Sequence, residues 1–457
     1  MLRSLYSGVS GLQNHQTRMD VIGNNISNVN TTGFKKSRVT FQDILSQTTS
    51  GAAKPSETRG GVNAKQVGLG MSVAAIETLM TQGSMQTTGK NTDIAITGEG
   101  FFVVQEGDQT FHTRNGNFML DRDGTLVNSN GMKVQGWTSE LYPTGEYMID
   151  TSAPVGDLKI EPGQKVEAKE TASVKFRSNL DANSAILPET ASAAENMLAT
   201  HGTSIDIFDP YGNNIRLSSN FKKNELNSWQ MSLAMTNEDG TVLENVQVSI
   251  NGAKLDTNNT LDLSFNTNGT LAGATETAGA AGDTLQEGQL VATVTYDHPD
   301  GTQQSFNLEL GEVGSVKNSI TQFASRFTTE AYFQDGNTMG YMESFNIDDT
   351  GVITGVMDNG VRRPLGQLAM SSFTNAAGLE KVGNSLYMSS NNSGDAMIGE
   401  SGLMGRGSLF VGALEMSNVD LAESFTDMIV TERGFQSNSR VITTSDNMLQ
   451  EILSLKR

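Results

Sequence analysis

The side chains that most resemble reactive groups lie in the stretch "FMLDRDGTLVNS", which begins at Phe118. A hydrophobic strand followed by Asp-x-Asp-Gly-Thr is typical of phosphatases in which the first carboxylate, here Asp121, is the covalent nucleophile and the second, Asp123, is the acid. Such enzymes need a parallel sheet with a crossover helix. Here Gly116 and Gly124 bracket a hairpin-like run, and no helical pattern follows it. We therefore expect a hairpin turn, and a phosphatase with Asp121 as nucleophile is the remaining enzymatic alternative.

Other kinds of site chemistry lack the residues that they need. The chain has no cysteine, and its four histidines have no metal-ligand spacing, so we expect neither a thiol nucleophile nor a metal site. The stretch "GSMQTTGKN" has one residue too many for a phosphate-binding loop and ends in Asn where Mg²⁺ needs a hydroxyl. The sequence therefore predicts a protein that is not an enzyme and that has no cofactor.

Charge and hydropathy argue against two further classes. The formal net charge of the 457 residues is -20, so binding to nucleic acid would have to overcome repulsion. No apolar run approaches the ~20 residues that span a bilayer, so we expect no membrane insertion. The basic pairs Lys35-Lys36 and Arg362-Arg363 are interpreted as solvated faces, which on an acidic protein could join acidic neighbours across subunits.

The two ends of the chain carry patterns that are typical of helices. Apolar residues recur every three or four positions from Leu2, and every seven positions from Leu421, which predicts a narrow stripe on each of two long helices. Such stripes have little to pack on except each other and other subunits. The predicted subunit-assembly residues are Leu5, Val9, Leu12, Met19, Ile26, Leu421, Phe425, Met428, Phe435, Ile442 and Leu449.

Between the ends, short alternating runs separated by glycine-bearing turns predict strands. The alternating sets Trp229, Met231, Leu233, Met235 and Phe306, Leu308, Leu310 each mark one buried face. The expected fold class is mainly β domains with paired long N- and C-terminal α-helices, in a nested discontinuous multidomain chain. The expected division is a terminal helical domain of 1–30 plus 414–457, a connecting segment of 31–91 plus 402–413, an inner β domain of 92–150 plus 341–401, and inserted outer β domains at 151–340.

Three ordered stretches resemble a known family. "SGVSGLQNHQTRMDVIGNNISNVNTTGFKKSRVTFQDIL" is similar to the N-terminal signature of bacterial flagellar rod and hook proteins, "GEGFFVV" with "TRNGNFMLDRDGTLVNSNGMKVQGW" to their inner β domain, and "GALEMSNVDLAESFTDMIVTERGFQSNSRVITTSDNMLQEI" to their C-terminal signature. The large middle favours the hook members, because the rod members are much shorter. In this family the terminal helices pair, so the repeated tripeptides Ser27-Asn28-Val29 and Ser417-Asn418-Val419 are expected to cap neighbouring strands of one joint.

The resemblance implies a structural subunit that self-assembles into the flagellar hook, a flexible tube that acts as a universal joint and passes motor torque to the filament. It implies a helical homo-oligomer, with the rod, the hook cap, the proteins of the hook-filament junction and the flagellar export apparatus as partners. The expected location is the hook, reached without a cleaved signal peptide, and it is extracellular, or periplasmic if the source is a spirochete. A distal rod-type axial protein and a surface adhesive module are the non-enzymatic alternatives.

The segment "EPGQKVEAKETASVKFRSNLDA", from Glu161, resembles the part of spirochete hook proteins that joins subunits covalently. There a Cys loses its sulfur to become dehydroalanine, and a Lys amine from another subunit adds to it. The resemblance places Lys165 at the nucleophile, but Ser178 stands at the Cys position. A thiol has a pKa near 8.5 whereas water has a pKa of ~15.7, so hydroxide leaves far more slowly than a thiolate. We therefore expect hooks of this chain to dissociate when boiled in detergent.

Overall fold

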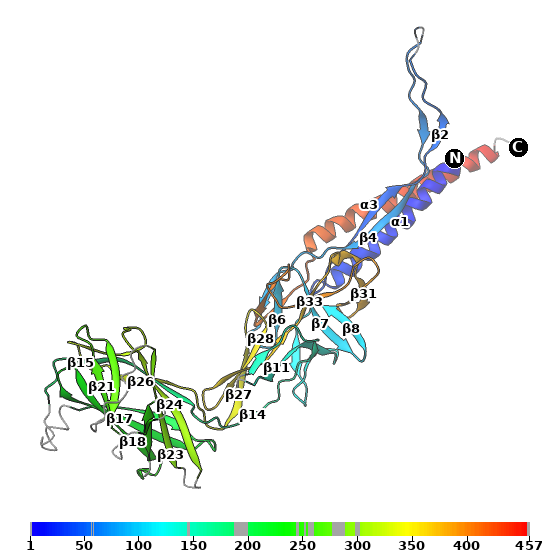
Figure 1. The fold of residues 1–457 in the computed structure, drawn as a ribbon. Coiled ribbons are helices and arrows are strands. Elements are labelled where there is room, and N and C mark those ends of the chain that lie inside the picture. Colours follow the sequence, from blue (N-terminus) through cyan, green and yellow to red (C-terminus); the bar gives the residue numbers. More distant parts are fainter. Residues whose placement is uncertain are drawn as a thin grey trace. The chain divides into compact units, whose positions relative to one another are not determined.

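The fold is mostly β-strand, with one long helix near each end of the chain (Figure 1). The computed structural model describes residues 2–55, 57, 59–143, 147–186, 200–243, 246–250, 253–254, 260–276, 288–297 and 302–454. Within these residues the α-helices are α1 (Leu2–Ser27) and α3 (Leu421–Ser454), and a short 3-10 helix covers Ala376–Gly378. The predictions of a mainly β chain and of two terminal helices are confirmed.

The chain divides into two compact units, each made of separate segments of the sequence. Unit 1 consists of Met1–Pro162, Ser344–Val356 and Arg362–Arg457. Unit 2 consists of Gly163–Glu343 and Met357–Val361. Both helices belong to unit 1, which therefore holds the residues predicted to assemble subunits.

Next to the helices, unit 1 contains four antiparallel strand pairs. They are β1 (Ser37–Asp43) with β4 (Met71–Thr78), β2 (Gln47–Ser50) with β3 (Lys65–Val67), β5 (Met85–Thr87) with β35 (Ala413–Glu415), and β6 (Ile94–Thr97) with β34 (Ser408–Val411). The last two pairs join residues more than three hundred positions apart in the sequence. They bring the segment that precedes α3 beside the segment that follows β4.

The largest sheet of unit 1 is built on a long central strand, β11 (Lys133–Leu141). The strand order is β28 (Val352–Met357), β29 (Arg362–Leu368), β11, β7 (Phe101–Glu106), β8 (Gln109–Thr113), β32 (Leu386–Met388) and β31 (Glu380–Gly383), and the added short strands are β9 (Phe118–Leu120), β10 (Leu126–Asn128), β12 (Tyr147–Ile149), β13 (Gly156–Asp157), β30 (Met370–Ser372) and β33 (Met397–Gly399). Apolar side chains such as Phe102, Val104 and Phe118 are fully buried here, so this sheet has a core of its own.

Unit 2 contains two larger sheets that share one apolar core. One has the order β20 (Ala253–Lys254), β19 (Gln247–Ile250), β23 (Gln289–Asp297), β24 (Gln303–Glu312), β15 (Ser173–Asp181), β25 (Ile320–Phe323), with β26 (Glu330–Gln334) beside β15; the other has the order β16 (His201–Phe208), β17 (Asn214–Glu225), β18 (Ser228–Asn237), β21 (Thr260–Phe265), β22 (Leu271–Glu276). Near the start of this unit, β14 (Lys165–Val166) pairs with Gly340 and Tyr341 of β27 (Gly340–Ile347), and β27 from Ser344 onward belongs to unit 1.

The core of unit 2 lies on alternate residues of its strands. Trp229, Met231 and Met235 of β18 are fully buried, and Phe306 and Leu308 of β24 belong to the same apolar cluster. Because side chains alternate between the two faces of a strand, this pattern is what a sheet buried on one face requires. The two predicted buried faces, with Leu233 and Leu310 included, are confirmed.

Candidate assembly site

The helices α1 and α3 pack side by side in antiparallel directions (Figure 1). Ser4, near the start of α1, faces Ser445 with 3.5 Å between their Oγ atoms. Three to four turns later, Arg18 forms an ion pair of 3.0 Å with Asp427. The order of contacts therefore runs forward along α1 and backward along α3.

The seam between the two helices is made of small and polar residues. A Cβ added to Gly11 would lie 2.5 Å from the amide nitrogen of Asn438, and one added to Gly434 would lie 2.8 Å from the ring of His15. A Cβ on Gly8 would meet Ile442 at 3.1 Å. Because only hydrogen occupies these positions, the two backbones approach each other more closely than apolar side chains would allow.

The predicted assembly residues mostly flank this seam. Ile442 packs against Gly8, so it does contact α1. The half-buried residues are Leu5, Leu12, Met19, Ile26, Met428, Ile442 and Leu449, and the exposed ones are Val9, Leu421, Phe425 and Phe435. At ~100° of rotation per residue, the row of Leu5 and Leu12 on α1 is turned well away from the row of Gly8 and Gly11. The structure therefore leaves much of the predicted stripe uncovered by the partner helix.

Sequence reasoning missed the glycine and asparagine residues of the seam. A glycine at a close helix contact leaves no mark in the pattern of apolar residues. A usable signal was present, because Gly8 and Gly11 lie three residues apart on α1 and Gly434 and Asn438 lie four apart on α3. Small residues at such spacings share one helix face.

Large apolar side chains remain exposed along α3 on two flanks of the seam. One flank carries Leu421, Phe425, Phe435 and Leu453, the other carries Val430, Val441, Met448 and Ile452, and Ile429 lies on the face opposite the seam. Phe425 is 50% exposed and Ile452 is 51% exposed. Because exposed apolar residues that follow one another along an element mark interaction surfaces, α3 offers surface for contacts beyond its own chain.

At the base of the helices, a buried ion cluster joins four distant segments. The Lys35 ammonium lies 2.6 Å from Glu415 Oε1, and Arg114 Nη1 lies 3.4 Å from Glu415 Oε2. Lys35 also donates to the carbonyl oxygen of Thr81, and the amide of Gly83 donates to Glu415. Burial lowers the pKa of Lys35, and the charge of Glu415 opposes that change. The interpretation of Lys35 as part of a solvated face is wrong, because the side chain is fully buried.

The two copies of the Ser-Asn-Val tripeptide lie at the junction between the helices and the strands, which we define by the ion cluster of Lys35, Arg114 and Glu415. Asn28, at the end of α1, donates to the carbonyl oxygen of Asn24 and accepts from Thr31. Asn418, which precedes α3, accepts from the backbone amide of Lys36 at 2.7 Å and donates to the carbonyl oxygen of Leu79 at 2.9 Å. Asn418 therefore links the start of α3 to Lys36, which precedes β1, and to Leu79, which follows β4.

The phosphatase-like motif forms a turn between β9 and β10. Asp121 Oδ1 accepts hydrogen bonds from the backbone amides of Asp123 and Thr125. Gly124 has a φ of 79°, a conformation that favours glycine. Asp121, Asp123 and Gly124 therefore each have a structural place in this hairpin turn. Among the described residues, no group of side chains could hold a metal ion, and no described helix is long and apolar enough to cross a membrane.

Lys165 and Ser178, which stand at the cross-link positions of the spirochete segment, lie on different strands of unit 2. Lys165 pairs with Tyr341 across β14 and β27, and its ammonium lies 5.5 Å from the centre of the Tyr341 ring. Ser178 lies within β15, where its backbone is opposite Ile320. Its side chain falls outside the part of the chain whose side chains the structure describes.

The seam, the exposed flanks and the sequence resemblance agree with four family matches. The matched models are "Flagella basal body rod protein" at residues 5–35, "Flagellar hook protein FlgE/F/G D1 domain" at 95–175, "Flagellar basal body protein FlaE D2 domain" at 179–337 and "Flagellar basal body rod FlgEFG protein C-terminal" at 411–455. Together they define the class as axial proteins of the bacterial flagellum.

Whole-chain relatives narrow this class. The chain is 50% identical to the flagellar hook protein FlgE of Treponema pallidum and 48% identical to that of Borreliella burgdorferi, over the full length of this chain and of both relatives. The chain belongs to the flagellar hook protein family. The crystal structure of Helicobacter pylori flagellar hook protein FlgE2 has a similar fold, with a TM-score of 0.50 at 13% identity over 72% of this chain and 99% of that one.

Proposed function

We propose that the terminal helices assemble this hook protein into its tubular polymer. The protein is a structural subunit of the flagellar hook and not an enzyme, as its full-length relatives indicate. The observation that carries the proposal is the uneven burial of α3. Its seam with α1 uses small or polar residues such as Gly434 and Asn438, whereas Phe425 and Phe435 stay exposed. The exposed rows are then buried by neighbouring copies.

The predicted assembly residues have separate parts in this proposal. Those on α3 that contact neighbouring copies along the flank of the seam are Leu421, Phe425, Met428, Phe435 and Leu449, whereas Ile442 contacts Gly8 of α1 within the seam. Those on α1, namely Leu5, Val9, Leu12, Met19 and Ile26, present a second row to another neighbour. Helices that bury their apolar rows only in the polymer are marginal alone, which keeps the ends of an unassembled chain weakly ordered.

A nested arrangement of domains completes the proposal. The terminal helices form the innermost layer, the segment of 31–91 plus 402–413 connects them to the inner β domain, and the insertion of 151–340 lies outermost. The pairing of β5 with β35 and of β6 with β34 supports this plan. In each pair, a strand from the N-terminal part of the chain lies beside a strand from the C-terminal part. A tight inner layer with more polar outer contacts gives a tube that bends while it transmits torque.

The partners of this polymer follow from the same proposal. They are other copies of the chain, the rod, the hook cap, the hook-filament junction proteins and the export apparatus. The two spirochete relatives support a hook that lies in the periplasm.

Charged substitutions on the exposed flank of α3 test the proposal. We expect Phe425→Asp and Phe435→Asp to abolish polymerisation, because a carboxylate cannot enter an apolar subunit contact without a large desolvation cost. The matched control is Asn447→Asp, which adds the same charge at an exposed polar position of α3. Sedimentation and electron microscopy would follow polymer formation, and circular dichroism would show that the strands stay folded. Normal tubes from both phenylalanine variants would disprove this assembly mode.

A further inference from the structure

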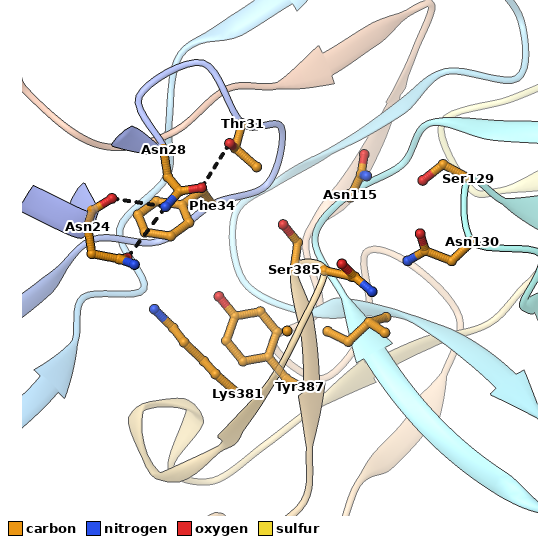
Figure 2. Close-up of a pocket in the computed structure, with 13 residues that line it drawn as sticks. Asn24, Asn28, Thr31, Phe34, Asn115, Ser129, Asn130, Lys381, Ser385 and Tyr387 are labelled. Atoms are coloured by element: carbon orange, nitrogen blue, oxygen red, sulfur yellow. Dashed lines mark hydrogen bonds between the residues drawn. The ribbon is translucent and has the colours of Figure 1, made fainter. Parts of the chain in front are cut away.

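A polar pocket of about 490 Å³ lies between the end of α1 and the hairpin of β31 and β32 (Figure 2). Amide and hydroxyl side chains, among them Asn28 and Ser385, line much of it, together with the rings of Phe34 and Tyr387. Lys381 carries the one charge among the described residues that line the pocket. All of these residues belong to unit 1. The pocket is therefore a polar cavity with a single cation.

The ammonium group of Lys381 has neutral neighbours. It donates to the carbonyl oxygen of Lys35 at 2.9 Å and to Ser37 Oγ at 3.2 Å, and it lies 5.0 Å from the centre of the Phe34 ring. The side chain as a whole is exposed, yet partial burial of its amine lowers the pKa of Lys381. Within the described part of the chain, Lys381 forms no ion pair with a carboxylate. One of its three N–H donors is left for another acceptor.

The buried cluster beside the pocket adds to its positive charge. Lys35 and Arg114 share the single carboxylate of Glu415, and all three side chains are almost fully buried. The exposed Glu99 acts on Arg114 through space and forms no ion pair with it. Lys381 donates to the carbonyl oxygen of Lys35 and does not pair with Glu415, so three cations lie near one buried carboxylate in a chain whose net charge is -20. The pocket is thus a local positive site on an acidic protein, and such a site attracts anions.

One wall of the pocket is the two-residue turn of the hairpin of β31 and β32. Asn384 and Ser385, at the tip of the hairpin, have φ values of 51° and 60°. Thr113 donates to the carbonyl oxygen of Ser385, and Ser385 Oγ donates to the carbonyl oxygen of Thr32. Asn384 and Ser385 are the two central residues of the turn between β31 and β32, where positive φ is the usual conformation, and the two hydrogen bonds hold this turn against the neighbouring segments. The wall is therefore preformed, which reduces the cost of binding.

We propose that this pocket receives an Asp or Glu side chain from a second copy of the chain, and that its carboxylate pairs with the Lys381 ammonium in the polymer. The inference rests on the proposed assembly into a tube. A second copy is the fitting occupant because each copy carries 51 acidic residues against 31 Lys and Arg. A free carboxylate would bind weakly here, whereas assembly holds the neighbour's carboxylate at a high effective concentration.

Carbodiimide cross-linking tests the contact directly. The reagent joins a carboxylate to an amine in contact with it by forming an amide, and it takes up the oxygen that leaves as a urea. Polymers would be made from an equal mixture of ¹⁵N-labelled and unlabelled protein, treated with the reagent and digested. We expect mixed-label peptides that join Lys381 to an Asp or Glu in polymers and none in monomers. Lys381→Arg should polymerise and lose this cross-link.

A charge-removal variant measures the contribution of the contact. Lys381→Gln should raise the concentration of protein left unassembled by about three-fold, with a smaller effect at high salt. The matched control Lys159→Gln removes an exposed cation that already pairs with Glu161, and it should leave assembly unchanged. Thermal unfolding of the monomers would show whether Lys381→Gln weakens the fold.

The outcomes separate this inference from the proposed assembly. If the wild-type protein forms tubes but Lys381 gives no cross-link between copies, or only one within a copy, the pocket contact is wrong and assembly stands. Equal assembly of Lys381→Gln and Lys159→Gln would overturn it as well. If the wild-type protein forms no polymer under any condition, the assembly proposal fails.

Discussion

At the scale of single residues, Glu415 holds the junction together. It is the one carboxylate shared by Lys35 and Arg114, and it also accepts from the amide of Gly83. A buried ion pair adds little net stability compared with apolar residues of the same shape, but removal of one partner leaves the other charge buried and unpaired. Glu415 is therefore a residue whose loss should cost far more than that of a surface carboxylate.

We predict that Glu415→Gln lowers the free energy of unfolding of unit 1 by about 3–5 kcal/mol, because Lys35 and Arg114 lose their counter-charge. The measurement is urea denaturation followed by the fluorescence of Trp137 in a Trp229→Phe background, so that the signal comes from unit 1. The control is Glu77→Gln, which removes an exposed partner of Arg38 and should cost less than about 1 kcal/mol. Equal losses for the two variants would contradict the assigned role.

A second residue-scale prediction concerns the covalent cross-link. Polymers with Ser178 should dissociate when boiled in detergent, because hydroxide is a poor leaving group. In Ser178→Cys, elimination would break the Cβ–S bond with release of hydrogen sulfide, and the Lys165 amine of a neighbour would then bond to Cβ. We expect ladders that survive boiling on denaturing gels.

The ladders should vanish in the double variant Ser178→Cys with Lys165→Ala. Boiling-resistant multimers of the Ser178 protein joined at Lys165 would show that the leaving-group argument is wrong. Absence of ladders from the cysteine variant under any alkaline condition would instead rule out the spirochete-type role of this segment.

At the scale of elements, the two terminal helices combine a close seam with exposed apolar flanks. The seam depends on glycine at positions where any Cβ would collide, as at Gly11 against Asn438. The flanks depend on side chains that the partner helix does not cover, such as Phe425 and Phe435. In the assembly that we propose, the pairing of the helices and the contacts of the polymer use different rows of the same elements.

We predict that Gly11→Val weakens the pairing of α1 and α3 by about 1–3 kcal/mol, because the added side chain must displace Asn438. Gly23 provides the control, because a Cβ there meets no atom within 4 Å. Hydrogen exchange of the α3 amides would detect the change, since protection falls when the helix pair opens. Gly11→Val should accelerate this exchange and Gly23→Val should not; equal protection in both variants would show that the seam is not close-packed.

The sequence alone predicts the helices and the buried strand faces, but it does not predict the seam. Period-seven spacing gave the helix that begins at Leu421, and alternation gave the buried faces at Trp229 and Phe306, because burial of large apolar side chains leaves a regular pattern. The seam was missed because its contacts come from glycine and amide residues, which leave no apolar pattern. Lys35 was missed because its partner, Glu415, is 380 residues away in the sequence, and only the folded chain joins the two.

At the scale of the whole molecule, each unit has its own core, and only unit 1 carries the terminal helices. Unit 2 buries one apolar cluster between its two larger sheets, and the main sheet of unit 1 buries residues such as Phe102 and Phe118. Neither core uses the exposed flanks of α3. We therefore expect folding of the β parts and formation of the polymer to be separable properties.

We predict that a chain shortened to residues 92–412 stays folded and monomeric at concentrations at which the full chain forms tubes. The shortened chain keeps β6 and β34, which pair with each other, together with the main sheet and all of unit 2. It loses α1, α3 and Glu415, and with them every row that we assign to subunit contacts. Far-UV circular dichroism should show retained β structure, and sedimentation should give a single monomer boundary. An unfolded or aggregated product would mean that the β parts need the helices to fold, and tubes made by the shortened chain would mean that assembly resides in the β parts.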